Sequence, residues 1–478
     1  MTAAVPDPKR WRALALVCVA MFMTVLDVSI VNVALPSIKT SLGVSDTSLE
    51  WILIAYTITF GGFLLLGGRT ADLLGRRRVF MAGMALFSVA SLACGLAGSM
   101  ALLIAARAVQ GLGAAIISPA TLSIITTTFD EGAERNKALG IWGAMAGSGA
   151  AAGVLFGGIL TKYAGWEWIF FVNVPVGALV LALTRSVVRE SRAEGLRRFD
   201  AAGAVTVTSG LALLVYAISK APDVGWATGR TIGLLVGAGV LLAAFAAIEA
   251  RQDSPLVPFR IFRTKTLAGA NVAGFLLGAV IFANFFVLTL YVQQVLGFSA
   301  LKTGLTFLAT AGTLIPIAGI SQALVTKIGV RPVMTAGLAL VTGAMVWYAQ
   351  IPVHGHYAAD LLPGYLMMAF GMAFAFIPVS VAALAGVEGH EAGLASGLIN
   401  TSQQVGGALG VAVASTVAFT HMRTLLASGH PQAEALTSGF ALAFWVLAGI
   451  GVVAVAAAAV LVRSSEVAVE AEAAAAAV

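Results

Sequence analysis

The stretch Leu26-Asp27-Val28-Ser29-Ile30-Val31-Asn32-Val33-Ala34-Leu35-Pro36 sets the fold class, because it places one carboxylate deep inside an apolar run. The run extends from about residue 13 to about residue 35 and holds no other charged side chain. About 20 apolar residues of helix cross the hydrocarbon core of a bilayer. A carboxylate at the centre of such a helix costs about 2.5–3.5 kcal/mol to insert, so we expect Asp27 to have a function.

Runs of this kind fill nearly the whole chain of 478 residues, of which 59% are hydrophobic and 10% are charged. Soluble domains carry roughly 25% charged residues. The sequence therefore predicts an all-α polytopic membrane protein with about 14 transmembrane helices. The predicted spans are approximately 13–35, 51–67, 79–98, 102–129, 138–160, 168–183, 201–218, 231–248, 267–291, 305–326, 333–349, 361–385, 394–420 and 440–461.

Lys and Arg are distributed unevenly between alternate loops. The N-terminus and every second loop carry about 21 of the 28 basic residues, whereas the remaining loops carry about six. Basic loops stay cytoplasmic. We therefore expect the cytoplasmic membrane as the location, with membrane lipid around the chain and both termini in the cytoplasm. No nucleic-acid partner is expected, since the basic residues form no single patch.

Internal repetition suggests how the chain is divided. Ala138-Leu139-Gly140 followed by Gly149 and Gly153 has the same spacing as Ala395-Ser396-Gly397 followed by Gly406 and Gly410. The role of the two helices that would lie between the repeated halves stays open. The predicted parts are an N-terminal six-helix bundle at 13–184, two inserted helices with flanking basic loops at 185–265, a C-terminal six-helix bundle at 266–462 and a disordered cytoplasmic tail at 463–478.

Asp27 and Arg107 are the clearest deep ionisable residues of opposite sign in the N-terminal half. Hydrocarbon disfavours a charged carboxylate, which suits Asp27 to taking up and releasing a proton; a structural hydrogen bond is the alternative. Arg107 cannot realistically lose its proton, so it is expected to act as a fixed charge beside a carboxylate, unless it reaches to the interface. A pair between the two residues is a hypothesis.

A basic cluster follows the second span and reads Gly68-Arg69-Thr70-Ala71-Asp72-Leu73-Leu74-Gly75-Arg76-Arg77-Arg78. Gly75 permits a tight turn, and Asp72 could accept hydrogen bonds from Arg76 and Arg77 or cap the next helix. We expect a latch between helical bundles here, although a cluster that only fixes orientation would look similar.

Small and neutral polar residues form two further groups of candidates. Glycines at four-residue spacing allow helices to approach closely, and neutral polar side chains can line a cavity or bridge helices. The packing candidates are Gly149, Gly153, Gly157 and Gly158 in the fifth span. The candidates for a substrate cavity are Asn32, Gln110, Asn284, Asn400, Gln403 and Gln404.

Several classes of function lack their sequence signals. There is no Gly-x-x-x-x-Gly-Lys-Ser/Thr loop for a nucleotide. Cys18 and Cys94 lie in apolar segments, so neither a disulfide framework nor a metal site is expected. No cluster of catalytic residues lies near a membrane surface. We therefore expect a protein that is not an enzyme and that uses no cofactor and no metal.

The motifs above resemble the major facilitator superfamily, over almost the whole chain. Gly68–Arg78 matches its signature between the second and third spans, with Thr70 and Leu73 where Leu and Arg are more usual. The fourteen spans, the Leu26–Pro36 stretch and the pattern Arg107…Gln110-Gly111 are similar to the 14-helix drug:proton antiporter family (EmrB/QacA type). One departure is Val154, which follows Gly153 where that family usually has proline.

The resemblance implies a secondary active transporter that exports hydrophobic or cationic small molecules, such as drugs or antibiotics, in exchange for protons. It ties the counterpart of Asp27 to proton or substrate coupling and that of Arg107 to proton transfer. A protein that works as a monomer is expected. Two alternatives stay open: proton-coupled uptake of a small solute, which Val154 slightly favours, and a membrane sensor that transports nothing.

Overall fold

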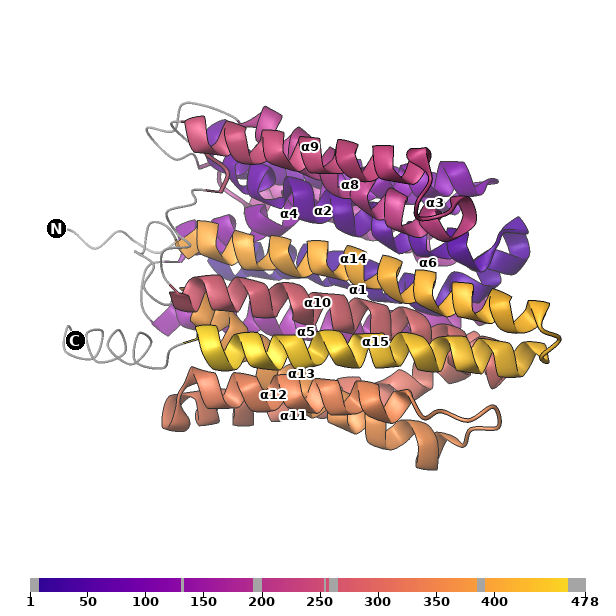
Figure 1. Ribbon diagram of the computed structural model, residues 1–478. Helices are drawn as coiled ribbons and strands as arrows, with labels where there is room; N and C mark the ends of the chain where they lie inside the picture. The colour runs from indigo at the N-terminus through magenta and orange to yellow at the C-terminus, as the bar shows by residue number, and fades with distance from the viewer. Residues whose placement is uncertain are drawn as a thin grey trace.

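The computed structural model describes residues 8–129, 133–191, 200–252, 255–257, 265–384 and 392–462. Every regular element in these ranges is helical, and no strand occurs among them (Figure 1). The elements are α1 (Arg10–Leu42), α2 (Asp46–Leu74), α3 (Arg76–Gly95), α4 (Met100–Thr128), α5 (Ala133–Tyr163), α6 (Trp168–Phe171), α7 (Asn173–Val187), α8 (Ala201–Val224), α9 (Gly229–Arg251), α10 (Lys265–Leu290), the π-helix η2 (Tyr291–Val295), α11 (Ala300–Ile328), α12 (Val330–Tyr348), the π-helix η3 (Tyr357–Leu361), α13 (Leu362–Leu384), α14 (Ala392–Ala427) and α15 (Gln432–Leu461).

The predicted fold class is confirmed. Thirteen helical segments of the described residues are long and apolar enough to cross a membrane. α5 is not among these thirteen segments, but it has 31 residues and packs alongside α1. Most helices extend several residues beyond the predicted spans. The predicted sixth span is the exception to a continuous helix, because α6 and α7 are separated at Val172. The predicted tail at 463–478 lies outside the described residues.

The long helices run alternately in opposite directions, so the start of α1 and the end of α15 lie at the same end of the bundle (Figure 1). We call this the terminal end, and the opposite one the far end. The turn at Gly75 and the last residues of α9 and α11 belong to the terminal end. The loops after α1, α8 and α14 belong to the far end. Which end faces the cytoplasm stays a prediction.

The helices pack as two sets that meet along two seams. In the first set α1 packs against α5, and α4 packs against α2 and α3. In the second set α10 packs against α14 and α15, and α12 packs against α13 and α15. The seams are formed by α2 on α14 and by α5 on α11. The predicted boundaries of the parts are not tested by this packing and stay predictions.

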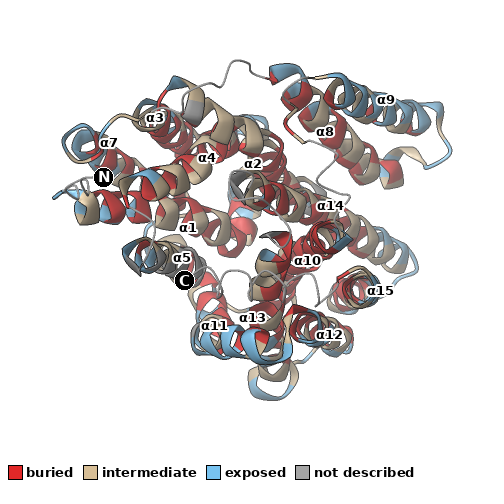
Figure 2. Ribbon diagram, turned by 90° about the vertical axis from the view of Figure 1, so that its left-hand side faces the viewer, coloured by how far each residue is buried: buried red, intermediate tan, exposed pale blue. Residues whose placement is uncertain are grey.

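α8 and α9 form a hairpin at the edge of the bundle (Figure 2). α8 lies against both α2 and α14, whereas α9 packs mainly on α8. Only 11% of the most apolar window of α9 is buried, against 78% for α10. α9 therefore presents most of its surface outward, where an apolar helix of a membrane protein meets lipid. α8 covers one of the two seams.

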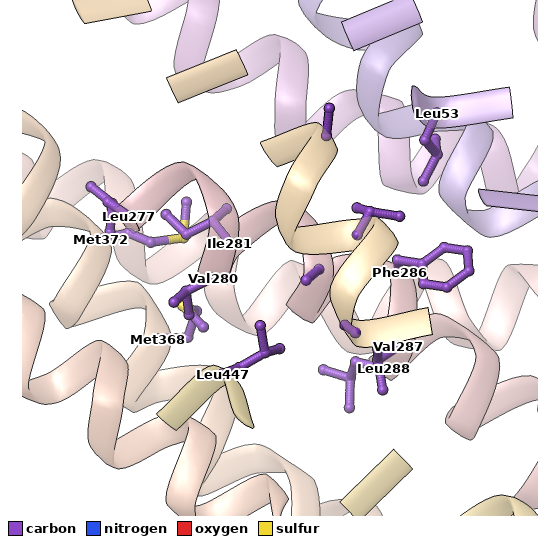
Figure 3. Close-up of a cluster of buried hydrophobic side chains, with 14 of the residues drawn as sticks. Leu53, Leu277, Val280, Ile281, Phe286, Val287, Leu288, Met368, Met372 and Leu447 are labelled. Atoms are coloured by element: carbon purple, nitrogen blue, oxygen red, sulfur yellow. The ribbon is translucent and has the colours of Figure 1, made fainter. Parts of the chain in front are cut away.

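The largest apolar core crosses from one set of helices to the other. It joins Leu53 of α2 with side chains of α10, α13 and α15, which include Leu277, Phe286, Met368 and Leu447 (Figure 3). A second core lies in the first set of helices and includes Phe80, Phe87 and Phe129. Dense packing of this kind favours a small number of discrete arrangements over continuous deformation.

Candidate functional site

Asp27 lies in the middle of α1 and is fully buried, with 0% of its surface exposed. Its Oδ2 accepts a hydrogen bond from Arg107 Nη1 at 2.5 Å. Its Oδ1 accepts from Gln110 Nε2 and from Asn173 Nδ2, each at 2.8 Å. The carboxylate is therefore not alone in an apolar interior, because three donors from α4 and α7 surround it.

Arg107 is held in place by contacts on several sides. Its Nε donates to the carbonyl oxygen of Ile52 at 3.1 Å, and its Nη1 also donates to Gln110 Oε1 at 2.7 Å. The guanidinium carbon lies 4.2 Å from the centre of the Tyr56 ring and 5.8 Å from that of Phe170. A planar cation that is stacked on an aromatic ring and hydrogen-bonded to backbone has one well-defined position. Arg107 therefore points at Asp27 and does not reach to a membrane surface.

Asn173 is a residue of this site that the sequence analysis did not identify. Its Nδ2 donates to Asp27 and also lies 3.1 Å from Ser91 Oγ, which in turn donates to the carbonyl oxygen of Phe170 at 2.8 Å. Asn173 is the first residue of α7, directly after the break from α6. Its side chain is buried and reaches α1 at Asp27 and α3 at Ser91. A polar residue close before Pro175, within an apolar span, was the available signal.

The site has room for a change of protonation beside Asp27. Tyr56 Oη and Asn173 Oδ1 are buried and have no hydrogen-bond partner among the described residues. A proton on Asp27 would convert one accepting oxygen into a donor and so displace at least one of the three present donors. It would also leave Arg107 without its counter-charge, which is costly in a buried place. A proton on Asp27 would therefore change the hydrogen bonds that link α1 to α4 and α7.

The predicted latch at the terminal end finds a partner outside the predicted motif. Gly75 has φ +107°, and the backbone N–H of Arg77 donates to Glu190 Oε1 at 3.1 Å. The side chains of Arg77 and Arg78 lie 3.7 and 3.6 Å from Glu190 Oε2. Arg76 Nε donates to Ser123 Oγ at 2.5 Å, and the Arg76 N–H donates to the Ser191 carbonyl. The side chain of Asp72 lies outside the described residues.

Gly68 and the glycines of α5 lie where helices touch. A Cβ added at Gly68 would lie 3.3 Å from Pro119 of α4. A Cβ added at Gly158 would lie 2.7 Å from the Ala300 carbonyl oxygen of α11, on the seam between the two sets. The other three predicted packing glycines face backbone carbonyl oxygens of α1. An added Cβ would lie 2.9 Å from the Phe22 oxygen at Gly149, 2.6 Å from the Leu26 oxygen at Gly153 and 2.7 Å from the Ile30 oxygen at Gly157.

The remaining polar candidates do not gather at one site. Asn32 and Asn400 each donate to a carbonyl oxygen of their own helix, that of Val28 and that of Ser396. The side-chain oxygens of Asn32, Asn284 and Gln404 are buried, and none has a hydrogen-bond partner in the part of the chain that the structure describes. Gln403 lies next to Gly278 of α10, and Gln404 lies next to Gly61 of α2. Of this group only Gln110 contacts Asp27. Within the described ranges, no group of three His, Cys, Asp or Glu residues could hold a metal ion.

Comparisons with known proteins agree on the family. The family model described as Major Facilitator Superfamily matches residues 17–411. The puromycin resistance protein pur8 of Streptomyces alboniger is 38% identical, over 94% of this chain and 89% of that protein. The cephamycin export protein CmcT of Amycolatopsis lactamdurans is 40% identical, over 85% of this chain and 84% of that protein. The lincomycin resistance protein of Streptomyces lincolnensis is 33% identical, over 93% of this chain and 90% of that protein.

Solved structures share the fold. A bacterial homologue of the lysosomal transporter Spinster superposes with a TM-score of 0.69 at 16% identity, covering 96% of this chain and 98% of that one. The peptide transporter PepTSo superposes with a TM-score of 0.70 at 16% identity, covering 95% of this chain and 98% of that one. At such identity the likeness concerns the fold alone.

Proposed function

The chain belongs to the major facilitator superfamily, and from this premise we propose that it exports hydrophobic or cationic small molecules, such as antibiotics, in exchange for protons. The relatives named above are a puromycin resistance protein, a cephamycin exporter and a lincomycin resistance protein. Their names cover three unlike antibiotics, which supports the class of cargo and leaves the individual substrate open.

One observation carries the proton-coupled part of the proposal: a carboxylate that three donors hold inside the membrane-spanning part of the chain. Arg107, Gln110 and Asn173 all donate to Asp27 while these helices are packed together. A proton on Asp27 releases these contacts, so proton binding and helix movement are linked. Arg107 keeps its charge throughout and acts on Asp27 as a fixed cation.

The proposed cycle moves the two sets of helices about the seams α2–α14 and α5–α11. The terminal end faces the cytoplasm, the protein works as a monomer and cargo enters from the cytoplasm or the inner leaflet. A proton from outside reaches Asp27 while the far end is open, and the return of the protonated protein releases it inside. For an uncharged cargo, one proton that crosses ~100 mV contributes about 2.3 kcal/mol, which sustains roughly a 50-fold gradient of cargo. Exchange of one proton for one monovalent cation moves no net charge, so the pH difference alone drives it.

The test is transport by purified protein in liposomes with an imposed pH difference. We expect Asp27→Asn to abolish proton-driven accumulation of a fluorescent cationic drug while it still permits exchange of labelled for unlabelled drug. Glu434→Gln, which neutralises an exposed carboxylate on α15, is the matched control and should transport normally. Full proton-driven transport by Asp27→Asn would refute the role of this residue.

The same liposomes separate export from uptake of a small solute, the second candidate. Val154 favours uptake weakly by departing from the antiporter pattern, and it is buried, with its carbonyl oxygen against Gly304 of α11. Antiport requires drug and proton to move in opposite directions. Movement in the same direction would establish uptake instead, and ligand binding without any flux would establish a sensor.

A further inference from the structure

Three parts of the chain meet around one buried carboxylate near the far end. Glu50 lies in the first turns of α2 and is 1% exposed. α8 of the hairpin and α14 of the second set both pack on α2 here. The Trp51 ring lies 6.0 Å from that of Tyr216, which fastens α2 to α8. Glu50 is distinct from the Asp27 site, whose ligands come from α4 and α7.

The carboxylate lies at a small cavity, and its Oε2 has no hydrogen-bond partner among the described residues. The cavity has about 10 Å³, room for about one water molecule, and its lining includes Glu50, Ser219 and Thr416. Glu50 Oε2, Ser219 Oγ and Thr416 Oγ1 are all buried without a hydrogen-bond partner among the described residues. A charged carboxylate in this setting would lose hydration without replacement. A neutral carboxyl group instead carries an O–H that either hydroxyl oxygen can accept.

The charged groups around the cavity are already paired with one another. Asp223 of α8 and Arg423 of α14 form an ion pair that ties the hairpin to the second set. Lys220 of α8 lies 3.5 Å from Asp223 Oδ2. Together these groups carry a net charge of about +1. Neither cation forms an ion pair with Glu50 in the described residues, since both point to Asp223.

We propose that Glu50 is a second proton site: its carboxyl group holds a proton while α8 and α14 are closed on α2, and releases that proton to water when the far end opens. The proposal rests on the export cycle above only in requiring that the seam between α2 and α14 opens there. The O–H bond of the carboxyl breaks as water enters, and the proton leaves on the far side.

This proton does not add to the number that drive export. It binds and leaves on the same side of the membrane, whereas the proton of Asp27 crosses. Glu50 therefore makes the far end sensitive to pH on that side, and acid favours closure. Acid outside would therefore favour closure of the far end after Asp27 has taken up its proton. A metal cation is the weaker alternative, because Lys220 and Arg423 lie close and the cavity is small.

The experiment measures the far-end distance by pulsed electron spin resonance on full-length protein in lipid nanodiscs. Spin labels are placed at Ser41→Cys in the last turn of α1 and at Ser428→Cys directly after α14, two exposed positions. The native Cys18 and Cys94 are buried, and the chain without added cysteines is the labelling blank. One proton can change a population ratio by at most about tenfold per pH unit. We expect the ratio of short to long distances to rise at least fivefold from about pH 9 to about pH 5.

Because Asp27 also binds a proton in the proposed cycle, the variants are compared in an Asp27→Asn background. There Glu50→Gln should favour the short distance throughout and should change that ratio less than about twofold over the same pH range. Glu434→Gln, at an exposed carboxylate of the same end, should behave as the parent protein. A parental pH response in Glu50→Gln would overturn the proposal, as would a response that follows sodium at constant pH. If the protein moves no drug but Glu50 still governs the distance, the export proposal fails and the proton site stands.

Discussion

Single residues decide the chemistry of the Asp27 site. Arg107 shows that a positive charge alone is not enough to hold the Asp27 carboxylate in place. Its Nε and Nη1 donate in different directions, to the Ile52 carbonyl and to Asp27. A lysine would supply one point charge on a flexible stem, which cannot satisfy the backbone oxygen and the carboxylate together. The shape of the cation, as well as its sign, therefore fixes where Asp27 lies.

We predict that Arg107→Lys lowers proton-driven drug transport at least tenfold and lowers the free energy of unfolding by about 2 kcal/mol. The reason is the lost bond to the Ile52 carbonyl and the lost stacking on Tyr56. Arg107→Ala should destabilise more, by about 3–5 kcal/mol, since Asp27 is then buried without a counter-charge. Thermal unfolding in nanodiscs measures stability, and liposome flux measures transport. Equal stability of the lysine and alanine variants would contradict this account.

The helices were far more predictable than the contacts between them. Each span needs about 20 apolar residues, so the thickness of the bilayer sets the length of the apolar runs in the sequence. The break between α6 and α7 left no such trace in the pattern of apolar residues. Asn173 was missed for that reason. Glu190 was missed because its partners, Arg77 and Arg78, lie more than a hundred positions earlier, and a single sequence does not show such pairings.

At the junction of α2 and α3, Gly75 is expected to resist substitution for two separable reasons. Its φ of +107° disfavours any side chain, and a Cβ would lie 2.6 Å from Glu190 Oε1. Gly429, with φ +86°, has no atom within 4 Å of an added Cβ. We predict that Gly75→Ala costs at least about 1 kcal/mol more than Gly429→Ala in thermal unfolding. Equal costs would show that Glu190 does not crowd this turn.

The glycines of α5 lie in two kinds of contact. Gly149, Gly153 and Gly157 face α1 in the same set of helices, whereas Gly158 faces α11 of the other set. A Cβ at Gly158 would press on the Ala300 carbonyl of α11 at the far end, whereas Gly449 of α15 has open space. We predict that Gly158→Ala shifts the Ser41–Ser428 distance toward the open form and that Gly449→Ala leaves it unchanged. The same spin-label measurement checks both. A closed distribution in Gly158→Ala would mean that the seam absorbs a methyl group.

For the molecule as a whole, the sequence predicted the fold class correctly. The division of the chain into two six-helix bundles and two inserted helices stays a prediction. The peripheral position of α9 explains why its role stayed open: an outward-facing apolar helix has the same composition whether it anchors, seals or merely fills space. The contacts of α8 are more informative, since α8 bridges α2 and α14 and carries Asp223 and Lys220 beside Glu50. The hairpin is thereby joined to the seam that must move.

The direction of transport depends on which end faces the cytoplasm, and the charge asymmetry makes a definite prediction. The N-terminus and every second loop hold about 21 of the 28 basic residues, and the reverse orientation would carry most of them across the membrane. Ser428→Cys, at the far end, should react with a membrane-impermeant maleimide in intact cells. Lys327→Cys, exposed at the terminal end, should react only after permeabilisation. The opposite pattern would invert the proposed cycle, because Asp27 would then be loaded with protons from the cytoplasm.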